Sequence, residues 1–167
     1  RPYSDVSDKH AMALKFIHLT DTHLAGPGLK LYGLDPRARL DAAVADINTH
    51  HSDAAFAVVT GDLTHWGEAE AYANFAESMA ALDMPYIAMV GNHDRRRTCL
   101  DMIKAAPRDA NDFVQGTQQT PHGLFVFLDT LDETSHAGEM CGKRLGWLAE
   151  TLAAAPAETP FVVFMHH

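Results

Sequence analysis

Hydrophobic and polar positions follow two alternating patterns along this chain: short apolar runs, and longer stretches in which apolar residues recur every three or four positions. The short runs are rich in β-branched and aromatic residues, which predicts strands. The five predicted strands cover residues 14–20, 56–60, 86–90, 124–128 and 161–165.

The stretches with helical spacing fall between these strands. Asp35 is a typical N-cap and Pro36 suits the first helical position, so the first helix should begin there. The predicted helices cover residues 36–49, 68–82, 95–106 and 143–155, and the polar stretch 111–119 predicts a loop.

Strands separated by helices predict an α/β fold with right-handed crossovers and a largely parallel sheet. The loops that follow parallel strands gather at one edge of such a sheet. Residues placed just after each strand should therefore meet in space.

Size and composition are those of one globular domain: 167 residues, 47% hydrophobic and 21% charged. We expect residues 1–11 to be a leader or tag remnant, and the domain to occupy residues 12–167. No apolar stretch reaches the roughly 20 residues that span a bilayer, and the start lacks the apolar core of a signal peptide. With only two cysteines, Cys99 and Cys141, we expect free thiols, a cytoplasmic location and no membrane partner.

The net charge of −9 narrows the choice of partners. Proteins that bind nucleic acids hold phosphate backbones mainly through clustered Lys and Arg, and this chain has no basic stripe. The balance of charge therefore argues against a nucleic-acid partner.

Four groups of polar residues follow four of the predicted strands. The groups are Asp21-Thr22-His23, Gly61-Asp62, Gly91-Asn92-His93-Asp94 and His166-His167. Carboxylate, amide and imidazole groups are ligands for Fe, Mn, Zn or Co, and the residue types do not choose among these metals. Their joint placement at strand ends predicts a metal site.

This set of motifs resembles the calcineurin-like metallophosphoesterase superfamily, and the match runs from Phe16 to His167. The resemblance implies an α-β-β-α sandwich, of which this chain holds the N-terminal part. Members of the superfamily add a distal Gly-His-x-His motif that this chain lacks, so five of the usual seven ligands are present and the domain is expected to be truncated before that motif.

The resemblance also implies a role for each residue at a centre of two metal ions. Asp21 and His23 would bind one metal, Asp62 would bridge both, and Asn92 and His166 would bind the second. His93 would be the catalytic histidine beside the leaving group. In such centres a hydroxide held between two ions about 3.5–4 Å apart attacks the phosphorus in line.

The residues within the motifs favour one branch of the superfamily. Gly-Asp-x-x-Asp-Arg-Gly and Gly-Asn-His-Glu, typical of its phosphoprotein phosphatases, are absent. Asp21-Thr22-His23-Leu24 and Phe164-Met165-His166-His167 look like the bacterial phosphodiesterases of cyclic nucleotides or glycerophosphodiesters, and Leu31-Tyr32-Gly33 favours the glycerophosphodiester subgroup. We expect a phosphoric diester hydrolase with a small phosphodiester substrate, forming a homo-oligomer.

Two other functions remain open. The fold can serve as a binding scaffold without catalysis, although a scaffold should have lost ligands that are present here. The same site can also cut nucleic acid, against which the net charge counts.

Several residues near the motifs allow two interpretations. His65 can touch substrate or be an ordinary loop residue, and the run Arg95-Arg96-Arg97 can meet a phosphate, although a solvated helix start is the favoured interpretation. Asp129 is expected to fix a loop by hydrogen bonding. The histidines in polar surroundings are assigned no role: His10, His50, His51, His122 and His136.

Overall fold

The computed structural model describes residues 13–167; the expected leader at 1–11 lies outside the described residues. Four helices and six strands make up the described part, in an order that follows the predicted one with a strand added. They are β1 Ile17–Leu19, α1 Pro36–His50, β2 Ala57–Val59, α2 Ala69–Met79, β3 Tyr86–Ala88, α3 Arg96–Met102, β4 Gly116–Thr120, β5 Gly123–Phe127, α4 Gly142–Ala154 and β6 Phe161–Phe164.

The strands form two sheets, and this corrects the expectation of a single, largely parallel one. The first sheet has the order β1-β2-β3 with both pairs parallel, and Ile17 faces Ala57, which faces Tyr86. In the second sheet, β5 lies parallel to β6 but antiparallel to β4. The predicted loop at 111–119 was wrong from Gly116 onward, because these polar residues pair along the length of β5.

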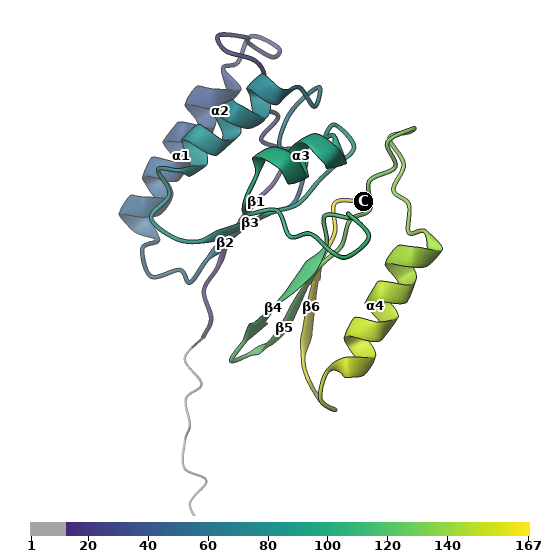
Figure 1. The fold of residues 1–167 in the computed structure, drawn as a ribbon. Helices are drawn as coiled ribbons and strands as arrows, with labels where there is room; N and C mark the ends of the chain where they lie inside the picture. The colour runs from purple at the N-terminus through teal and green to yellow at the C-terminus, as the bar shows by residue number, and fades with distance from the viewer. Residues whose placement is uncertain (1–12) are drawn as a thin grey trace, which may run out of the picture.

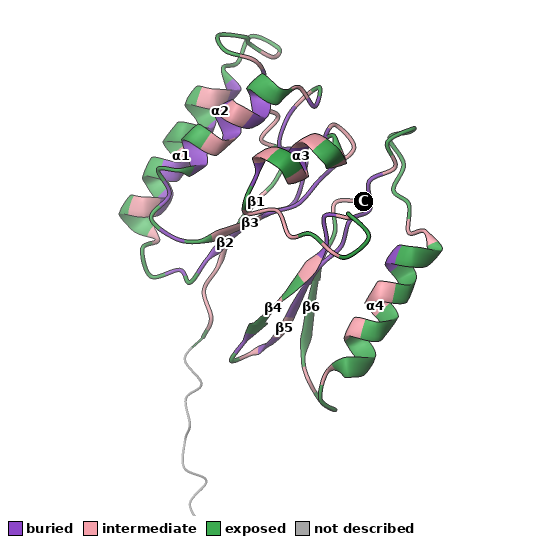
Figure 2. Cartoon of the chain, viewed as in Figure 1, coloured by how far each residue is buried: buried purple, intermediate pink, exposed green. Residues whose placement is uncertain are grey.

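The two sheets and the helices form the layers of an α-β-β-α sandwich (Figure 1). Helices α1 and α2 cover one face of the first sheet, the second sheet lies against its other face, and α4 lies beyond the second sheet. This arrangement confirms the predicted fold class. Burial follows the layers: the inner stripes of α1 and α2 are buried, whereas α4 is mostly exposed (Figure 2).

Alternation along the strands produces two separate hydrophobic cores. Ala57 and Val59 of β2 point toward the core shared with α1 and α2. Val58, between them, points to the other face and packs in the cluster that contains Phe125 and Phe127 of β5. Because β2 is buried on both faces, its sequence is an uninterrupted apolar run.

Local signals explain where α1 begins and which face it buries. The Asp35 carboxylate accepts a hydrogen bond of 3.1 Å from the Ala38 backbone N–H, and Pro36 occupies the first turn. Leu40, Val44 and Ile47 then form the buried stripe. The loops after β1, β2, β3 and β6 follow the carboxyl ends of their strands, where the candidate site lies.

Candidate metal centre

Asp62 lies at the centre of the candidate site, buried in the loop after β2. Its Oδ2 atom is 3.6 Å from His23 Nε2 and 3.5 Å from His166 Nε2. Its Oδ1 atom accepts a hydrogen bond of 2.9 Å from the backbone N–H of His93. One carboxylate thus faces imidazole nitrogens from the loop after β1 and from the segment that follows β6.

Asp21 completes a group of potential ligands on the β1 side. Its Oδ1 atom is 3.6 Å from His23 Nε2, and ligand atoms of Asp21, His23 and Asp62 all lie within 4.8 Å of one another. A cation between them would be held by two carboxylates and one imidazole, which is a donor set suited to Mn, Fe, Zn or Co.

His166 is oriented by the backbone. Its Nδ1–H donates to the Thr60 carbonyl at 2.9 Å, which leaves Nε2 directed at Asp62. Metal-binding histidines commonly donate their second ring N–H in this way. The Asp62 carboxylate raises the pKa of His166; the pKa of Asp62 is itself lowered, because hydrogen bonds from His166 and the His93 backbone outweigh the effect of burial.

The backbone is in the left-handed region at three of these residues. Asp21, His23 and Asp62 have φ values of 55°, 44° and 49°. Residues other than glycine adopt this region rarely, at a cost of order 1–3 kcal/mol each, and such residues cluster at functional sites. The strain therefore marks the same loops that the motifs mark.

Two glycines allow the loops to approach one another. A Cβ atom added at Gly61 would lie 2.8 Å from His166 Nδ1 and 2.7 Å from the backbone nitrogen of Gly91. A Cβ at Gly91 would lie 2.8 Å from His166 Nε2 and would collide with the Asp62 carboxylate. Glycine is needed at both positions because the backbone there lies against the side chains of Asp62 and His166.

Asp94 connects the loops after β2 and β3 through hydrogen bonds to their backbones. The sequence did not predict this role. Its buried carboxylate accepts backbone N–H bonds from Leu63, Thr64 and Gly91, at 2.9–3.1 Å. It also accepts from the Thr64 hydroxyl and the Tyr72 hydroxyl. Burial raises the pKa of Asp94, and these five donors act against that rise.

His93 presents one free ring nitrogen to the site. Its Nδ1–H donates to the His65 carbonyl at 2.8 Å, so Nε2 is the atom left for a substrate. The His93 ring is 4.9 Å from the His23 ring, edge to face. His93 therefore stands beside the candidate metal ligands without joining the Asp62 cluster through its ring.

His65 lies beside the candidate metal ligands. Its Nδ1 atom is 3.3 Å from Nδ1 of His23, and its ring stacks at 4.9 Å on that of His93. Burial lowers the pKa of His65, and positive charge on His93 and His23 lowers it further. A neutral His65 can accept the Nδ1 proton of His23 and leave His23 Nε2 free to bind a cation.

Asn92 differs from the other predicted ligands. Within residues 13–167, its side chain forms no hydrogen bond with Asp21, His23, Asp62 or His166. Its amide nitrogen lies 2.9 Å from Nδ1 of His136, a residue to which the sequence assigned no role. The His136 ring is also 5.5 Å from that of His93. Nothing in the polar sequence around His136 signals this placement, which depends on how the loop before α4 folds back.

The three consecutive arginines lie in different environments. Arg97 is exposed and pairs with Asp101, as expected for a solvated helix start. The expectation was wrong for Arg96, which is mostly buried and forms a two-pronged ion pair with Asp129 at 2.6 and 3.1 Å. Asp129 also accepts backbone N–H bonds from Val114 and Leu131, so its predicted role in fixing a loop is confirmed.

Cavities open on both sides of His93 and His65. One of about 780 Å³ is lined by Asp21 and His23 together with apolar residues that include Leu31 and Tyr32. The other, of about 430 Å³, is lined by a mostly polar set: Trp66, Asn92, Arg95, Glu133, Thr134, Ser135 and His136. Either cavity is large enough for the organic part of a small phosphodiester.

Known proteins are similar to this chain over most of its length. A family model described as calcineurin-like phosphoesterase matches residues 14–167. A probable cyclic nucleotide phosphodiesterase of Rhodopseudomonas palustris is 49% identical over 156 residues, covering 92% of this chain and 57% of that protein. A cAMP/cGMP dual specificity phosphodiesterase of Mycobacterium tuberculosis is 34% identical over 90% of this chain and 48% of its own length.

A more distant relative is a glycerophosphodiester phosphodiesterase of Enterobacter lignolyticus, 28% identical over 90% of this chain and 55% of that protein. The chain thus spans about half the length of the curated relatives it matches. The solved purple acid phosphatase from yellow lupin seeds superimposes with a TM-score of 0.68 at 15% identity, covering 92% of this chain and 30% of that one, which shows the shared fold. Among the described helices, none is long and apolar enough to cross a membrane.

Proposed function

Because the chain belongs to the calcineurin-like phosphoesterase family, we propose that the protein is a phosphodiesterase that hydrolyses small phosphodiesters at a centre of two metal ions. The proposed metal ligands are those that the motifs predict: Asp21, His23, Asp62, Asn92 and His166. The observation that carries the proposal is the single Oδ2 atom of Asp62, which faces Nε2 of both His23 and His166.

The residues fit such a centre by their donor chemistry. The Thr60 carbonyl engages Nδ1 of His166, so Nε2, beside Asp62, is the ring atom that His166 could offer to a cation. Two divalent ions held by these residues would supply Lewis-acid stabilisation of phosphoryl oxygens and would lower the pKa of bound water. The acidic surface of the protein would then surround a locally cationic site.

We assign His93 the proton transfer to the departing oxygen. The His65 carbonyl fixes the proton of His93 on Nδ1, which leaves Nε2 as the atom that can exchange a proton with substrate. The backbone N–H of His93 also donates to Asp62 Oδ1, which fixes the position of the proposed acid relative to the proposed bridging carboxylate. His93 would thus act on the leaving group, while Asp62 would help to hold the metal ions.

The substrate class follows from the relatives as a proposal. The relative at 49% identity carries the name of a probable cyclic nucleotide phosphodiesterase, and the relative at 28% identity that of a glycerophosphodiester phosphodiesterase. We therefore propose 3′,5′-cyclic nucleotides first and glycerophosphodiesters second. A homo-oligomeric state, a cytoplasmic location and the choice among Mn, Fe, Zn and Co stay predictions.

Hydrolysis of bis(p-nitrophenyl) phosphate by the complete protein with Mn²⁺ tests the activity. We expect the wild type to hydrolyse the substrate far faster than buffer containing Mn²⁺ does. The Asp62→Asn variant should lose this activity. A wild-type rate equal to that of the buffer would instead support the alternative of a binding scaffold without catalysis.

A comparison of two substrates tests the proposed substrate class. With 3′,5′-cyclic AMP and glycerophosphoethanolamine compared at equal concentration, the larger kcat/KM should belong to the cyclic nucleotide. A larger value for glycerophosphoethanolamine would reverse the order. Cleavage of single-stranded DNA exceeding both would favour the nuclease alternative despite the net charge of −9.

A further inference from the structure

Residues 131–139, between β5 and α4, form a closed loop beside the candidate metal centre. Leu131 and Gly138 pair as an antiparallel bridge, and the backbone N–H of Glu139 donates to the Thr130 carbonyl at 2.9 Å. Inside the loop, the Asp132 carboxylate accepts hydrogen bonds from Thr134 and Ser135. The 131–139 loop therefore has a defined shape although its tip is exposed.

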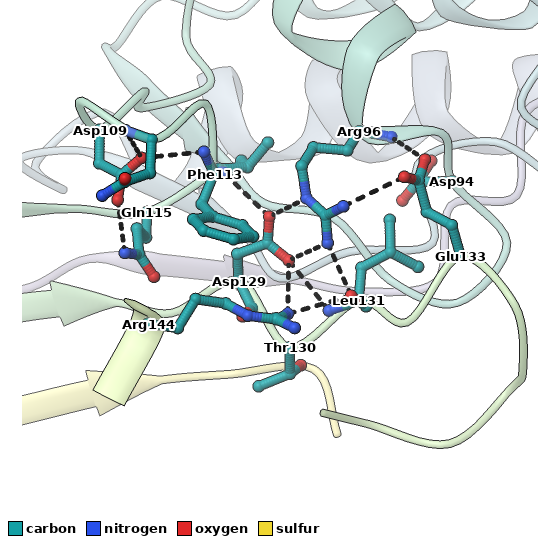
Figure 3. A network of polar contacts seen from close by, with 12 residues as sticks. Asp94, Arg96, Asp109, Phe113, Gln115, Asp129, Thr130, Leu131, Glu133 and Arg144 are labelled. Carbon is teal, nitrogen blue, oxygen red and sulfur yellow. Dashed lines mark hydrogen bonds and ion pairs between the residues drawn. The ribbon is translucent and has the colours of Figure 1, made fainter. Parts of the chain in front are cut away.

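Two arginines form hydrogen bonds with the base of this loop (Figure 3). Arg96 donates to the Leu131 carbonyl at 2.6 Å and to the Glu133 carboxylate at 3.1 Å. Arg144, only 2% exposed, donates to the same carbonyl at 3.0 Å and to Glu139 at 2.8 Å. Each guanidinium nitrogen of Arg144 has at least one hydrogen-bond partner, and a buried side chain bonded in this way holds its partners in place.

Asp129 connects these two arginines. Both guanidinium groups reach its buried carboxylate, and both lie over the Phe113 ring, with Cζ at 5.1 Å for Arg96 and 4.9 Å for Arg144. Arg96 is four residues beyond Asn92 in the chain. The loop that carries Asn92 and the 131–139 loop are thus attached to one rigid base.

The tip of the 131–139 loop meets Asn92 through His136. The 2.9 Å contact joins Nδ2 of Asn92 to Nδ1 of His136. An amide nitrogen can only donate, so His136 Nδ1 is the acceptor and carries no proton. Among the residues that the structure describes, none donates to the amide oxygen of Asn92, which remains open.

We propose that His136 is a positioning residue for the second metal ion and acts through Asn92. By holding the amide nitrogen, His136 makes Oδ1 the end of the amide that is offered to a cation. Without that acceptor the amide can turn and present its NH₂ group, which has no lone pair to give. This inference rests on the proposed function, because it concerns the ligand set of that centre.

Two substitutions separate the hydrogen bond from the bulk of the side chain. His136→Asn places an acceptor oxygen near the position of Nδ1, whereas His136→Leu keeps a similar volume and has no acceptor. His122→Leu is the matched control, because His122 lies in the turn at the opposite end of β5. All three variants replace histidines outside helices and strands.

The hydrogen bond itself can be observed without metal or substrate. In the metal-free, ¹⁵N-labelled protein we expect a nitrogen–nitrogen coupling across the hydrogen bond between Asn92 Nδ2 and His136 Nδ1. The coupling should persist in His122→Leu. Absence of any such coupling in the wild type would overturn the inference even if the enzyme hydrolyses phosphodiesters.

Titration of the complete protein with Mn²⁺ alone then tests the consequence. His136→Leu should bind one of two Mn²⁺ ions about 10- to 100-fold more weakly, the usual effect of removing an orienting partner of a ligand. His136→Asn should recover most of that loss and His122→Leu should match the wild type. Equal binding by His136→Leu and wild type, or equal weakness of the Leu and Asn variants, would contradict the proposed role.

The two proposals can fail separately. A wild type that binds two Mn²⁺ ions without hydrolysing any diester would refute the proposed function and leave the role of His136 intact. A protein that hydrolyses diesters, binds two ions and is unaffected by His136→Leu would refute only the inference.

Discussion

Histidine side chains in the candidate centre differ in which ring nitrogen is already engaged. Nδ1 of His166 and of His93 donates to a backbone carbonyl, which leaves Nε2 of each directed at the site. Nδ1 of His136 instead accepts a hydrogen bond from Nδ2 of Asn92. In each case one hydrogen bond of the ring decides the proposed role. His166 is the proposed ligand, His93 the proposed acid and His136 the proposed positioning residue.

His93→Ala should separate proton transfer from metal binding. Loss of a general acid typically lowers the rate by about 10²- to 10⁴-fold, whereas the metal content should stay at the wild-type value because the ring is not a proposed ligand. Steady-state hydrolysis and elemental analysis of the same sample measure both quantities. A variant that loses its metal would place His93 among the ligands.

Asp132 gives a pH prediction that is independent of the metal site. Hydrogen bonds from the Thr134 hydroxyl and backbone and from Ser135 lower the pKa of its carboxyl from 3.8 to about 2. The folded state therefore favours the carboxylate, so the stability that it contributes is complete above pH 3.8 and is lost as the pH falls through about 2. A carbon-detected NMR titration of the carboxyl group should find the low midpoint.

Thr134→Val is the control for that titration, because it removes the hydroxyl that lies 2.7 Å from Asp132 Oδ1. The midpoint of Asp132 should then move upward toward 3.8. An ordinary midpoint in the wild type, or no change in Thr134→Val, would show that these hydrogen bonds do not hold the 131–139 loop in solution.

Residues that the sequence did not reveal share a physical cause. Arg96 belongs to a run of like charges, which usually remains solvated, and only its buried partner Asp129 explains why it does not. His136 lies in a polar loop whose path depends on Arg96 and Arg144. Local composition cannot signal contacts between segments some 40 residues apart in the chain.

At the scale of elements, α2 supports the candidate centre through Tyr72. The Tyr72 hydroxyl donates to Asp94 at 2.9 Å and accepts from the backbone N–H of Arg95 at 2.9 Å. Asp94 in turn holds the backbone of the loops after β2 and β3. Helix α2 is thereby attached to the segment that carries Asn92 and His93.

Tyr72→Phe should destabilise the protein by about 1–3 kcal/mol, because it leaves the part-buried N–H of Arg95 and the buried carboxylate of Asp94 each short of one partner. Tyr32→Phe is the matched control, since Tyr32 is 93% exposed and its hydroxyl should contribute little. Urea unfolding of both variants measures the difference. Equal stability of the two would mean that the Tyr72 hydroxyl does not hold the loops.

Element positions followed closely from hydrophobic periodicity, and the exceptions are informative. Helix α1 was predicted at 36–49 and lies at Pro36–His50, because cap and apolar stripe agree. Strand β4 was missed because Gly116–Thr120 has no apolar pattern and owes its extended form to pairing with β5. Edge strands of this kind are defined by their neighbour more than by their own residues.

At the scale of the whole molecule, the periodicity predicted strands and helices but not their division into two sheets. An apolar run such as that of β5 fits a parallel or an antiparallel neighbour equally well. The sandwich arrangement came from the family resemblance, and the two hydrophobic cores on opposite faces of the first sheet explain it physically. The loops of both sheets then contribute to one centre.

Because the chain spans about half the length of its relatives, the central claim is best tested on the complete protein. Elemental analysis after saturation with Mn²⁺ and removal of free metal should find two Mn²⁺ per chain in the wild type. Asp62→Ala should hold fewer than one, because both ions would lose the carboxylate that faces His23 and His166. A wild type without bound metal, or an Asp62→Ala variant that still holds two ions, would contradict the account.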